Sequence, residues 1–428
     1  MRDSTIPTPA SARSVVQPTF LTRTMRQLVL GRLHGLRDGS LTILDGDEPL
    51  TFGESSPHCP LSATLRVHDV RFYTDLVVGG SVGAGEAYIK GWWSCEDLTT
   101  LVRILVRNRA VLEGLDAGPA WLSVPLRKLF HALRRNTKRG SSRNIVAHYD
   151  LGNDFFALFL DETMTYSCGI FEHIDSTLQE ASLAKIDRIC QKLQLSSSDH
   201  LLEIGTGWGG FALHAARRYG CRVTTTTISP QQYHYAQQRI ADAGLTDRVT
   251  VLLKDYRALT GQYDKLVSIE MIEAVGHAFY DTYFKRCSEL LKPDGMMLLQ
   301  AITIADQQYE AAKRSVDFIQ RYIFPGSCIP SITAISQSLA RVTDLRLFHL
   351  EDITPHYAET LRHWRERFFA HLSQVRRLGY SEELIRMWEF YFCYCEGGFR
   401  ERVIGDVHML LTKPLCRRAP ILPALGLV

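Results

Sequence analysis

Residues 201–210 read LLEIGTGWGG, an apolar run that passes into four glycines within six positions. Gly205, Gly207 and Gly210 satisfy the G-x-G-x-x-G spacing, in which glycines let the backbone turn sharply between a strand and a helix and approach a bound cofactor. The loop alone leaves three interpretations open. It can bind a dinucleotide, it can bind S-adenosylmethionine, or it can simply connect a strand to a helix.

The segments around this loop alternate between strand and helix patterns. We expect strands at 200–205, 221–228, 248–255, 263–270 and 296–304, and helices at 178–195, 211–220, 230–244 and 280–295. Ser229 and Pro230 form a typical cap and first-turn pair for the helix that follows them. The alternation predicts an α/β fold with a doubly wound, mostly parallel sheet. Beyond Ala305 the chain reads as largely helical.

The residues near the glycines separate the two cofactors. A nicotinamide enzyme needs a carboxylate or an Arg about 20 residues after the loop, and here the second strand ends VTTTTIS. Glu203 instead precedes the glycines, where it would repel a pyrophosphate but suits the sulfonium and ammonium of S-adenosylmethionine. Asp255 and Tyr256 close the third strand with an acceptor and a stacking face for adenine. Together these features favour S-adenosylmethionine and a methyltransferase-type domain.

Composition and charge limit the other classes of function. A net charge of +3 argues against a nucleic-acid coating protein, and no run approaches the ~20 apolar residues that span a bilayer. The N-terminus lacks a secretory signal, and the ten cysteines contain no C-x-x-C pair. We therefore expect a cytoplasmic protein with reduced thiols and no metal site.

The first hundred residues combine short β-like runs (LRVHDVRFYTDLVV) with the turn-rich stretch GGSVGAGEAYIKGWW. From 117 to 149 there is no acidic residue, and seven positions are basic: Arg127, Lys128, Arg134, Arg135, Lys138, Arg139 and Arg143. A basic amphipathic stretch can lie on an anionic membrane. It can equally be a solvated connector beside a packed helix.

From about Asn144 onward the chain resembles the cyclopropane-fatty-acyl-phospholipid synthases. The resemblance is carried by NIVAHYDLGNDFFALFLDETMTYSCGIFE, LLEIGTGWGGFA, TTISPQQ, KDYRAL, YDKLVSIEMIEAVG, RYIFPGSCIPS, PHYAETLRHWRERF and EGGFR. GAGEAYIKGWW is similar to the family's N-terminal domain. The polar, Pro/Ser-rich N-terminus predicts a flexible tail at 1–20. The resemblance implies a membrane-associating α+β domain at 21–135 and a methyltransferase domain with a helical acyl-binding cap at 136–428.

The resemblance also implies a reaction. A cis alkene in an acyl chain of membrane phospholipid takes the methyl of S-adenosylmethionine, and the carbocation that results closes to a cyclopropane. The alternatives are a methylene or methyl branch, or a soluble or carrier-bound acyl acceptor. The enzyme would sit peripherally on the inner face of the membrane, and the family allows a homodimer.

Site residues follow from the resemblance position by position. The base in this family is a bound bicarbonate ion, and the residues that match its site are Cys168, Glu273, Gln300, Ile302 and Tyr357. The residues that match the methyl-donor site are Tyr166, Ser167, Glu203, Gly205, Gly207, Thr227, Ile228, Gln232 and Tyr256, to which the strand-end argument adds Asp255. Glu270 is the competing carboxylate, and we prefer Glu273.

Two positions depart from the family pattern. Ala274 and Gln300 stand where the family often has His. A glutamine can hydrogen-bond an anion but cannot share its proton, so the departures concern the final proton rather than methyl transfer. Related sequences with Glu-Ala and Gln-Ala-Ile-Thr include enzymes that leave a methylene branch.

Overall fold

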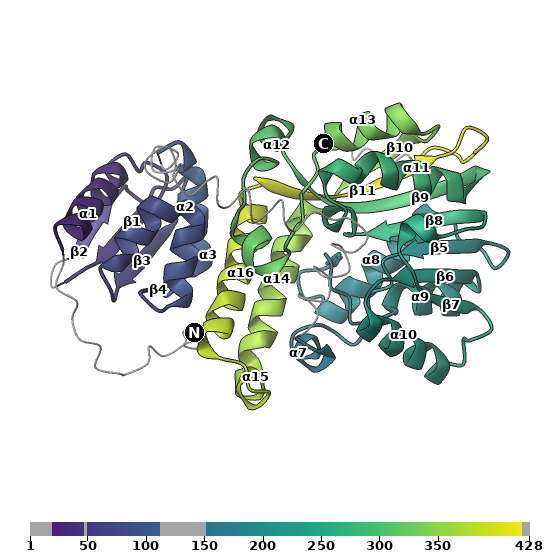
Figure 1. Ribbon diagram of the computed structural model, residues 1–428, viewed down its shortest axis with the longest axis horizontal. Coiled ribbons are helices and arrows are strands. Elements are labelled where there is room, and N and C mark those ends of the chain that lie inside the picture. Colours follow the sequence, from purple (N-terminus) through teal and green to yellow (C-terminus); the bar gives the residue numbers. More distant parts are fainter. Residues whose placement is uncertain (1–18, 47–48, 112–150, 422–428) are drawn as a thin grey trace. The chain divides into compact units, whose positions relative to one another are not determined.

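A computed structural model describes residues 19–46, 49–111 and 151–421 (Figure 1). The chain divides into two compact units. The N-terminal unit spans Met1–Leu133, Arg314–Pro325 and Leu361–Val403, and the sheet unit spans Arg134–Lys313, Gly326–Thr360 and Ile404–Val428. The predicted tail lies almost entirely outside the described residues, as do the predicted boundary at 135 and the basic segment. Those three assignments stay predictions.

The sheet unit is built on seven strands in the order β10-β11-β9-β8-β5-β6-β7. They are β5 (His200–Ile204), β6 (Arg222–Thr227), β7 (Val249–Leu253), β8 (Tyr263–Ile269), β9 (Leu291–Ile304), β10 (Arg346–Asp352) and β11 (Ile404–Thr412). Strands β5 to β9 pair in parallel, and β11 is antiparallel to both β9 and β10. The predicted doubly wound, mostly parallel sheet is confirmed.

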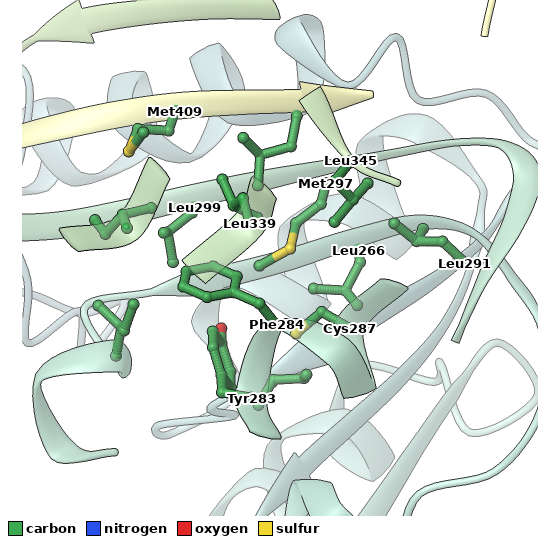
Figure 2. Packing of buried hydrophobic residues seen from close by; sticks show 14 of the residues in the cluster. Leu266, Tyr283, Phe284, Cys287, Leu291, Met297, Leu299, Leu339, Leu345 and Met409 are labelled. Atoms are coloured by element: carbon green, nitrogen blue, oxygen red, sulfur yellow. The ribbon is translucent and has the colours of Figure 1, made fainter. Parts of the chain in front are cut away.

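Side chains of the central strands alternate between two hydrophobic cores. Leu202, Leu266 and Met297 lie in the core with α11 (Tyr280–Leu290) and α13 (Ile332–Val342), part of which Figure 2 shows. Their neighbours Leu201, Val267 and Leu298 lie in the opposite core with α8 (Leu178–Lys192), α9 (Gly210–His214) and α10 (Pro230–Asp242). Both faces of the strands are therefore apolar, as a parallel sheet requires.

Local sequence signals fix several helix ends. The Ser229 hydroxyl accepts from Gln232 N and Pro230 occupies the first turn of α10, as predicted. Thr177 and Glu180 form a capping box at the start of α8. The remaining helices of the sheet unit include α7 (Asn153–Ala157) and α12 (Asp306–Ala312).

The N-terminal unit has its own four-stranded sheet in the order β2-β1-β3-β4. Its strands are β1 (Ser40–Leu44), β2 (Pro49–Phe52), β3 (Ser62–Val67) and β4 (Trp93–Cys95), and its helices include α1 (Phe20–Leu33), α2 (Arg71–Ile89), α3 (Leu98–Arg107), α15 (Leu372–Arg377) and α16 (Glu382–Arg400). Helix α14 (Thr354–Ala370) contributes to both units.

One part of the secondary-structure prediction was wrong, and another was incomplete. Residues 71–89 form one kinked helix, α2, instead of a strand and a turn. Its kink is at Gly80, where φ is +56°, and a Cβ at Gly83 would come within 1.9 Å of the Asp75 carbonyl oxygen, so the glycines permit close packing across the kink. The segment beyond Ala305 contains strands β10 and β11 besides its helices. Among the described residues, no helix is both long and apolar enough to cross a membrane.

Candidate active site

The topological switch point of the sheet lies between β5 and β8. Strand β5 pairs with β6 on one side and with β8 on the other, and Glu203 is aligned with Val267 of β8. Ligands of doubly wound sheets bind at the carboxyl ends of the strands at such a point. Two loops lie at the carboxyl ends of these strands: the glycine loop after β5 and the acidic segment 270–273 after β8.

The glycine loop has the backbone geometry that its sequence predicts. Gly205 and Gly207 have φ values of +106° and +51°, which only glycine adopts readily. The Gly205 amide donates to the Thr226 carbonyl oxygen at 3.0 Å, which ties the loop to β6. A Cβ at Gly207 would meet nothing within 4 Å, whereas one at Gly210 would lie 2.5 Å from the Thr163 carbonyl oxygen. Gly207 therefore leaves room for a ligand, and Gly210 serves close packing.

Glu203 carries a buried carboxylate with an unsatisfied oxygen. The residue is 2% exposed, and Oε2 has no hydrogen-bond partner among the described residues. Burial raises the pKa of this carboxyl to about 8. A buried acid of this kind fits a cationic ligand, because an ammonium or sulfonium nearby would favour its ionised form. The site thus fits S-adenosylmethionine at the position that the sequence predicted.

The other predicted donor-site residues follow the ends of β6 and β7 or lie in the Y-S-C segment. The Thr227 hydroxyl donates to Gln232 Oε1 at 2.9 Å, which fixes the turn that contains Ile228 at the start of α10. The Tyr256 ring packs edge-on against Tyr283 at 5.3 Å between centroids. The Asp255 carboxylate accepts two side-chain hydrogen bonds from Arg257, an ion pair that the sequence reading missed.

Tyr166 and Ser167 occupy different surroundings. The Tyr166 ring packs against Phe156 and Phe159, with centroid distances of 5.4 and 6.0 Å. Ser167 is buried, and its hydroxyl accepts from Lys185 Nζ at 2.7 Å. Lys185 projects from α8 and is itself buried, so burial lowers the pKa of its ammonium while nearby carboxylates oppose that shift.

Three of the residues expected around a bound anion converge on Glu270. Its Oε1 accepts from the Cys168 backbone amide at 2.8 Å and from Gln300 Nε2 at 2.7 Å. Its Oε2 accepts from the Tyr357 hydroxyl at 2.5 Å. These donors come from the Y-S-C segment, from β9 and from α14, so segments far apart in the sequence meet at one carboxylate.

Glu273, the preferred carboxylate of the sequence analysis, lies on a short 3-10 turn at 272–274. Its Oε1 accepts from the Ile302 backbone amide at 2.6 Å, which brings these two predicted residues together. The residue is 7% exposed, and Oε2 has no partner among the described residues. Burial, with the Glu270 charge adding to it, raises the pKa of Glu273 to about 8.

A polar network on β9 and β11 holds the Gln300 amide. Gln300 Nε2 also donates to Asp406 Oδ2 at 2.9 Å, and Gln300 Oε1 lies 3.2 Å from His408 Nε2. His408 Nδ1 lies 3.1 Å from Lys192 Nζ, so that nitrogen accepts from the ammonium and Nε2 carries the hydrogen that Gln300 receives. Through these contacts the amide is oriented with its NH2 group toward Glu270.

The charges of this network are set by burial. Burial and the neighbouring Glu270 raise the pKa of Asp406 well above its usual range, so Asp406 is the member that retains a proton. Burial also raises the pKa of Glu270, but the Tyr357 hydrogen bond, Lys185 and the Cys168 amide oppose that shift. Burial raises the pKa of the Cys168 thiol well above its usual range, so at neutral pH this residue contributes its backbone amide rather than a thiolate.

Sequence reasoning missed Lys185, Asp406 and His408. Lys185 had a detectable signal, since it follows Leu178, Ala181 and Ser182 at helical spacing on the buried face of α8. Asp406 and His408 had none, because β11 was not predicted.

The chain matches the family described as mycolic acid cyclopropane synthetase over residues 136–409. It belongs to this family. A tuberculostearic acid methyltransferase of Mycobacterium tuberculosis is 42% identical over 329 residues, which cover 75% of this chain and 76% of that protein. A cyclopropane-fatty-acyl-phospholipid synthase of Escherichia coli is 38% identical over 347 residues, which cover 80% and 86% of the two chains.

Solved structures of this mycolic acid cyclopropane synthetase family agree with the fold. A cyclopropane synthase from M. tuberculosis aligns with a TM-score of 0.60 at 34% identity, covering 64% of this chain and 98% of that one. A mycolic acid cyclopropane synthase crystallised with S-adenosylhomocysteine and CTAB aligns with a TM-score of 0.59 at 35% identity, covering 64% and 98%. This chain is therefore an S-adenosylmethionine-dependent methyltransferase. The predicted cofactor and family are confirmed.

Proposed function

We propose that this enzyme transfers the methyl of S-adenosylmethionine to the cis double bond of an unsaturated acyl chain in membrane phospholipid, and that the resulting carbocation closes to a cyclopropane. The observation that carries the proposal is the cluster of Glu270, Gln300 and Tyr357 at the end of β8, the strand beside the one that leads into the glycine loop. Methyl transfer from a sulfonium to an alkene leaves a cation and one proton to remove, and this cluster supplies anionic and hydrogen-bonding groups for both tasks.

The chain's own residues account for donor binding. S-adenosylmethionine, when bound, supplies an electrophilic methyl group on a sulfonium. Gly205 and Gly207 allow close approach of the backbone, and the unpartnered Glu203 oxygen offers an acceptor for the cationic part of the molecule. Tyr256 would stack on the adenine. The remaining proposed donor contacts are Tyr166, Ser167, Thr227, Ile228, Gln232 and Asp255.

Aromatic rings and a buried carboxylate of the site would stabilise the carbocation. Tyr166, a proposed donor contact two residues before Cys168, packs against the rings of Phe156 and Phe159, and ring faces stabilise positive charge. The carboxylate of Glu270 lies in a buried setting, where a negative charge stabilises a cation more strongly than in water.

The second candidate is a branched acyl product from the same carbocation. The departures at Ala274 and Gln300 favour it, because the resembling sequences with Glu-Ala and Gln-Ala-Ile-Thr include enzymes that leave a methylene branch. The relative that is 42% identical is a tuberculostearic acid methyltransferase by name, whereas the E. coli relative is a cyclopropane synthase by name. The two candidates share every step up to the cation.

A phospholipid acceptor requires that the enzyme reach a membrane from the cytoplasm. We propose that the N-terminal unit and the basic segment at 117–149 provide this contact on the inner face of the membrane. Neutralising Arg134, Arg135, Lys138 and Arg139 together should weaken binding to anionic vesicles, and the loss should be largest at low salt. Equal vesicle binding by the variant and the wild type at low salt would remove the basic segment from the proposal.

The test of the acceptor uses methyl-labelled donor with three monounsaturated acceptors: phospholipid vesicles, the free fatty acid and an acyl thioester. We expect label in the acyl chains of the vesicles at the highest kcat/KM. Preferential labelling of the free acid or the thioester would move the substrate class to soluble or carrier-bound acyl chains. Absence of label from all three would reject acyl-chain methylation.

A further inference from the structure

The carboxylate of Glu270 occupies the centre of the hydrogen-bond donors that the family resemblance assigns to a bicarbonate ion. The Cys168 amide, the Gln300 side-chain amide and the Tyr357 hydroxyl all donate to it, at 2.8, 2.7 and 2.5 Å. A carboxylate and a bicarbonate ion present the same planar pair of oxygens. The donors therefore already hold an anion, and that anion belongs to the chain.

A second anion does not fit these residues. It would compete with Glu270 for the same three donors and would lie beside the Glu270 carboxylate. The Ile302 amide, also expected to hold the ion, donates instead to Glu273 Oε1 at 2.6 Å. Like charges in a buried setting repel strongly, so a bound bicarbonate is disfavoured while Glu270 is ionised.

The backbone conformation at Glu270 indicates a functional role for this residue. Its φ is +46°, in the left-handed region that favours glycine, and only three other described non-glycine residues have positive φ. The Glu270 amide donates to the Gln300 carbonyl oxygen at 2.9 Å, which holds this conformation between β8 and β9. Strained non-glycine backbone of this kind is concentrated at functional sites.

We propose that Glu270 is the catalytic base of the enzyme and replaces the bicarbonate ion of its family. The inference rests on the proposed function, since it concerns the proton of that reaction. Gln300 and Tyr357 then position the carboxylate, and Gln300 needs no proton-sharing ability because Glu270 receives the proton. Gln300 in place of His and the acid at position 270 thus act together: Gln300 positions the carboxylate that takes the proton.

In the proposed reaction, methyl transfer comes first and proton removal second. The alkene π electrons form the bond to the methyl carbon, and the electrons of the carbon–sulfur bond remain on sulfur, which becomes a neutral thioether. For the cyclopropane, a C–H bond of the transferred methyl then breaks and its electron pair bonds to the cationic carbon. For a branched product, a C–H bond on a carbon beside the cationic centre breaks and its electron pair forms a new double bond. The proton passes to the carboxylate of Glu270, whose Oε1 accepts from Cys168 and Gln300 and whose Oε2 accepts from Tyr357.

The test measures methyl transfer to monounsaturated phosphatidylglycerol vesicles in carbon-dioxide-depleted buffer, with and without added sodium bicarbonate. We expect the wild type to turn over at the same rate in both buffers. Glu270→Gln should lose about 100-fold or more in kcat in both, which is the usual contribution of a general base. Glu289→Gln, an exposed site on α11 of the sheet unit, is the matched control and should retain wild-type turnover.

A rescue variant separates catalysis from folding. Glu270→Gly removes the carboxylate and suits the φ of +46°, so it should fold, bind S-adenosylhomocysteine like the wild type and regain turnover at least tenfold when bicarbonate is added. A wild-type enzyme that requires added bicarbonate would overturn the assignment of Glu270 and leave the proposed function intact. Wild-type turnover by Glu270→Gln without bicarbonate would overturn it as well. Absence of methylated lipid from the wild type in both buffers would overturn the proposed function and this inference with it.

Discussion

Gln300 on β9 donates its side-chain amide at 2.7 Å to the carboxylate of Glu270, which follows the neighbouring strand β8. The same nitrogen donates to Asp406 at 2.9 Å, so one buried amide holds two acids of different protonation state. The position of the Glu270 carboxylate therefore depends on the Gln300 amide, and the orientation of the amide depends on the carboxylate. It also provides direct predictions for the stability and the pH dependence of the enzyme.

Gln300→Met keeps the approximate volume of the side chain and removes both donated hydrogen bonds. Two buried carboxyl groups would lose a partner, so we expect a loss of about 2–4 kcal/mol in the free energy of unfolding. Denaturant unfolding at neutral pH measures this loss. A change below about 0.5 kcal/mol would show that the amide does not support the two acids.

Tyr357→Phe removes the 2.5 Å hydrogen bond to Glu270 Oε2. That hydroxyl stabilises the ionised carboxylate, so its loss should raise the pKa of Glu270 further. Because a base must be ionised to act, the acid limb of the kcat–pH profile should move to higher pH, and kcat at pH 7 should fall about tenfold. Affinity for S-adenosylhomocysteine should stay unchanged. An unshifted acid limb would argue against Glu270 as the titrating group.

Glu273 makes protein stability depend on pH, because its pKa is raised to about 8 in the folded protein by burial and by the Glu270 charge. The unfolded chain releases this proton near its ordinary pKa, so the contribution of Glu273 is fully present at low pH and is lost as pH rises toward 8, by up to about 1.4 kcal/mol per pH unit. Glu273→Gln cannot ionise. Its melting temperature relative to the wild type should therefore increase between pH 5 and pH 8, and a constant difference would contradict the raised pKa.

Substitutions at two glycines of the loop after β5 should have different effects, one on cofactor binding and the other on stability. Gly207→Ala meets no atom within 4 Å but must keep a φ of +51°, at a cost of about 1–2 kcal/mol. We expect weaker binding of S-adenosylhomocysteine in calorimetry, with the fold retained. Gly210→Ala places a Cβ 2.5 Å from the Thr163 carbonyl oxygen, and we expect a stability loss of about 1–3 kcal/mol. Equal donor affinity in Gly207→Ala and the wild type would remove the loop from the donor site.

The sheet unit was predictable because its signals are local. The strands from β5 to β9 are rich in apolar or β-branched residues and are bounded by turn residues. Helix caps such as Ser229 follow strand ends directly. Strands β10 and β11 were missed because the surrounding sequence is helical and aromatic-rich. In α2 the isolated glycines predict turns, whereas tertiary packing makes the segment a kinked helix.

The sequence indicated residues that lie together in the fold, but it did not indicate which carboxylate they contact. Cys168, Gln300 and Tyr357 do come together, as the resemblance implied, but they converge on Glu270 rather than on Glu273. No periodicity distinguishes two acids three residues apart. The backbone φ at Glu270 and the direction of three donors distinguish them, and both are properties of the folded chain.

The most direct measurement supplies full-length enzyme with monounsaturated phospholipid vesicles and a donor carrying three deuteriums on its methyl, then follows acyl mass and alkene signals. We predict acyl chains that gain one carbon with two deuteriums and lose the alkene, which is the cyclopropane. Two deuteriums with an exocyclic alkene, or three with an internal alkene, would identify the branched product of the same cation. Deuterium found only in the headgroup, or no gain of a labelled carbon by the acyl chains, would contradict methylation of an acyl double bond by this enzyme.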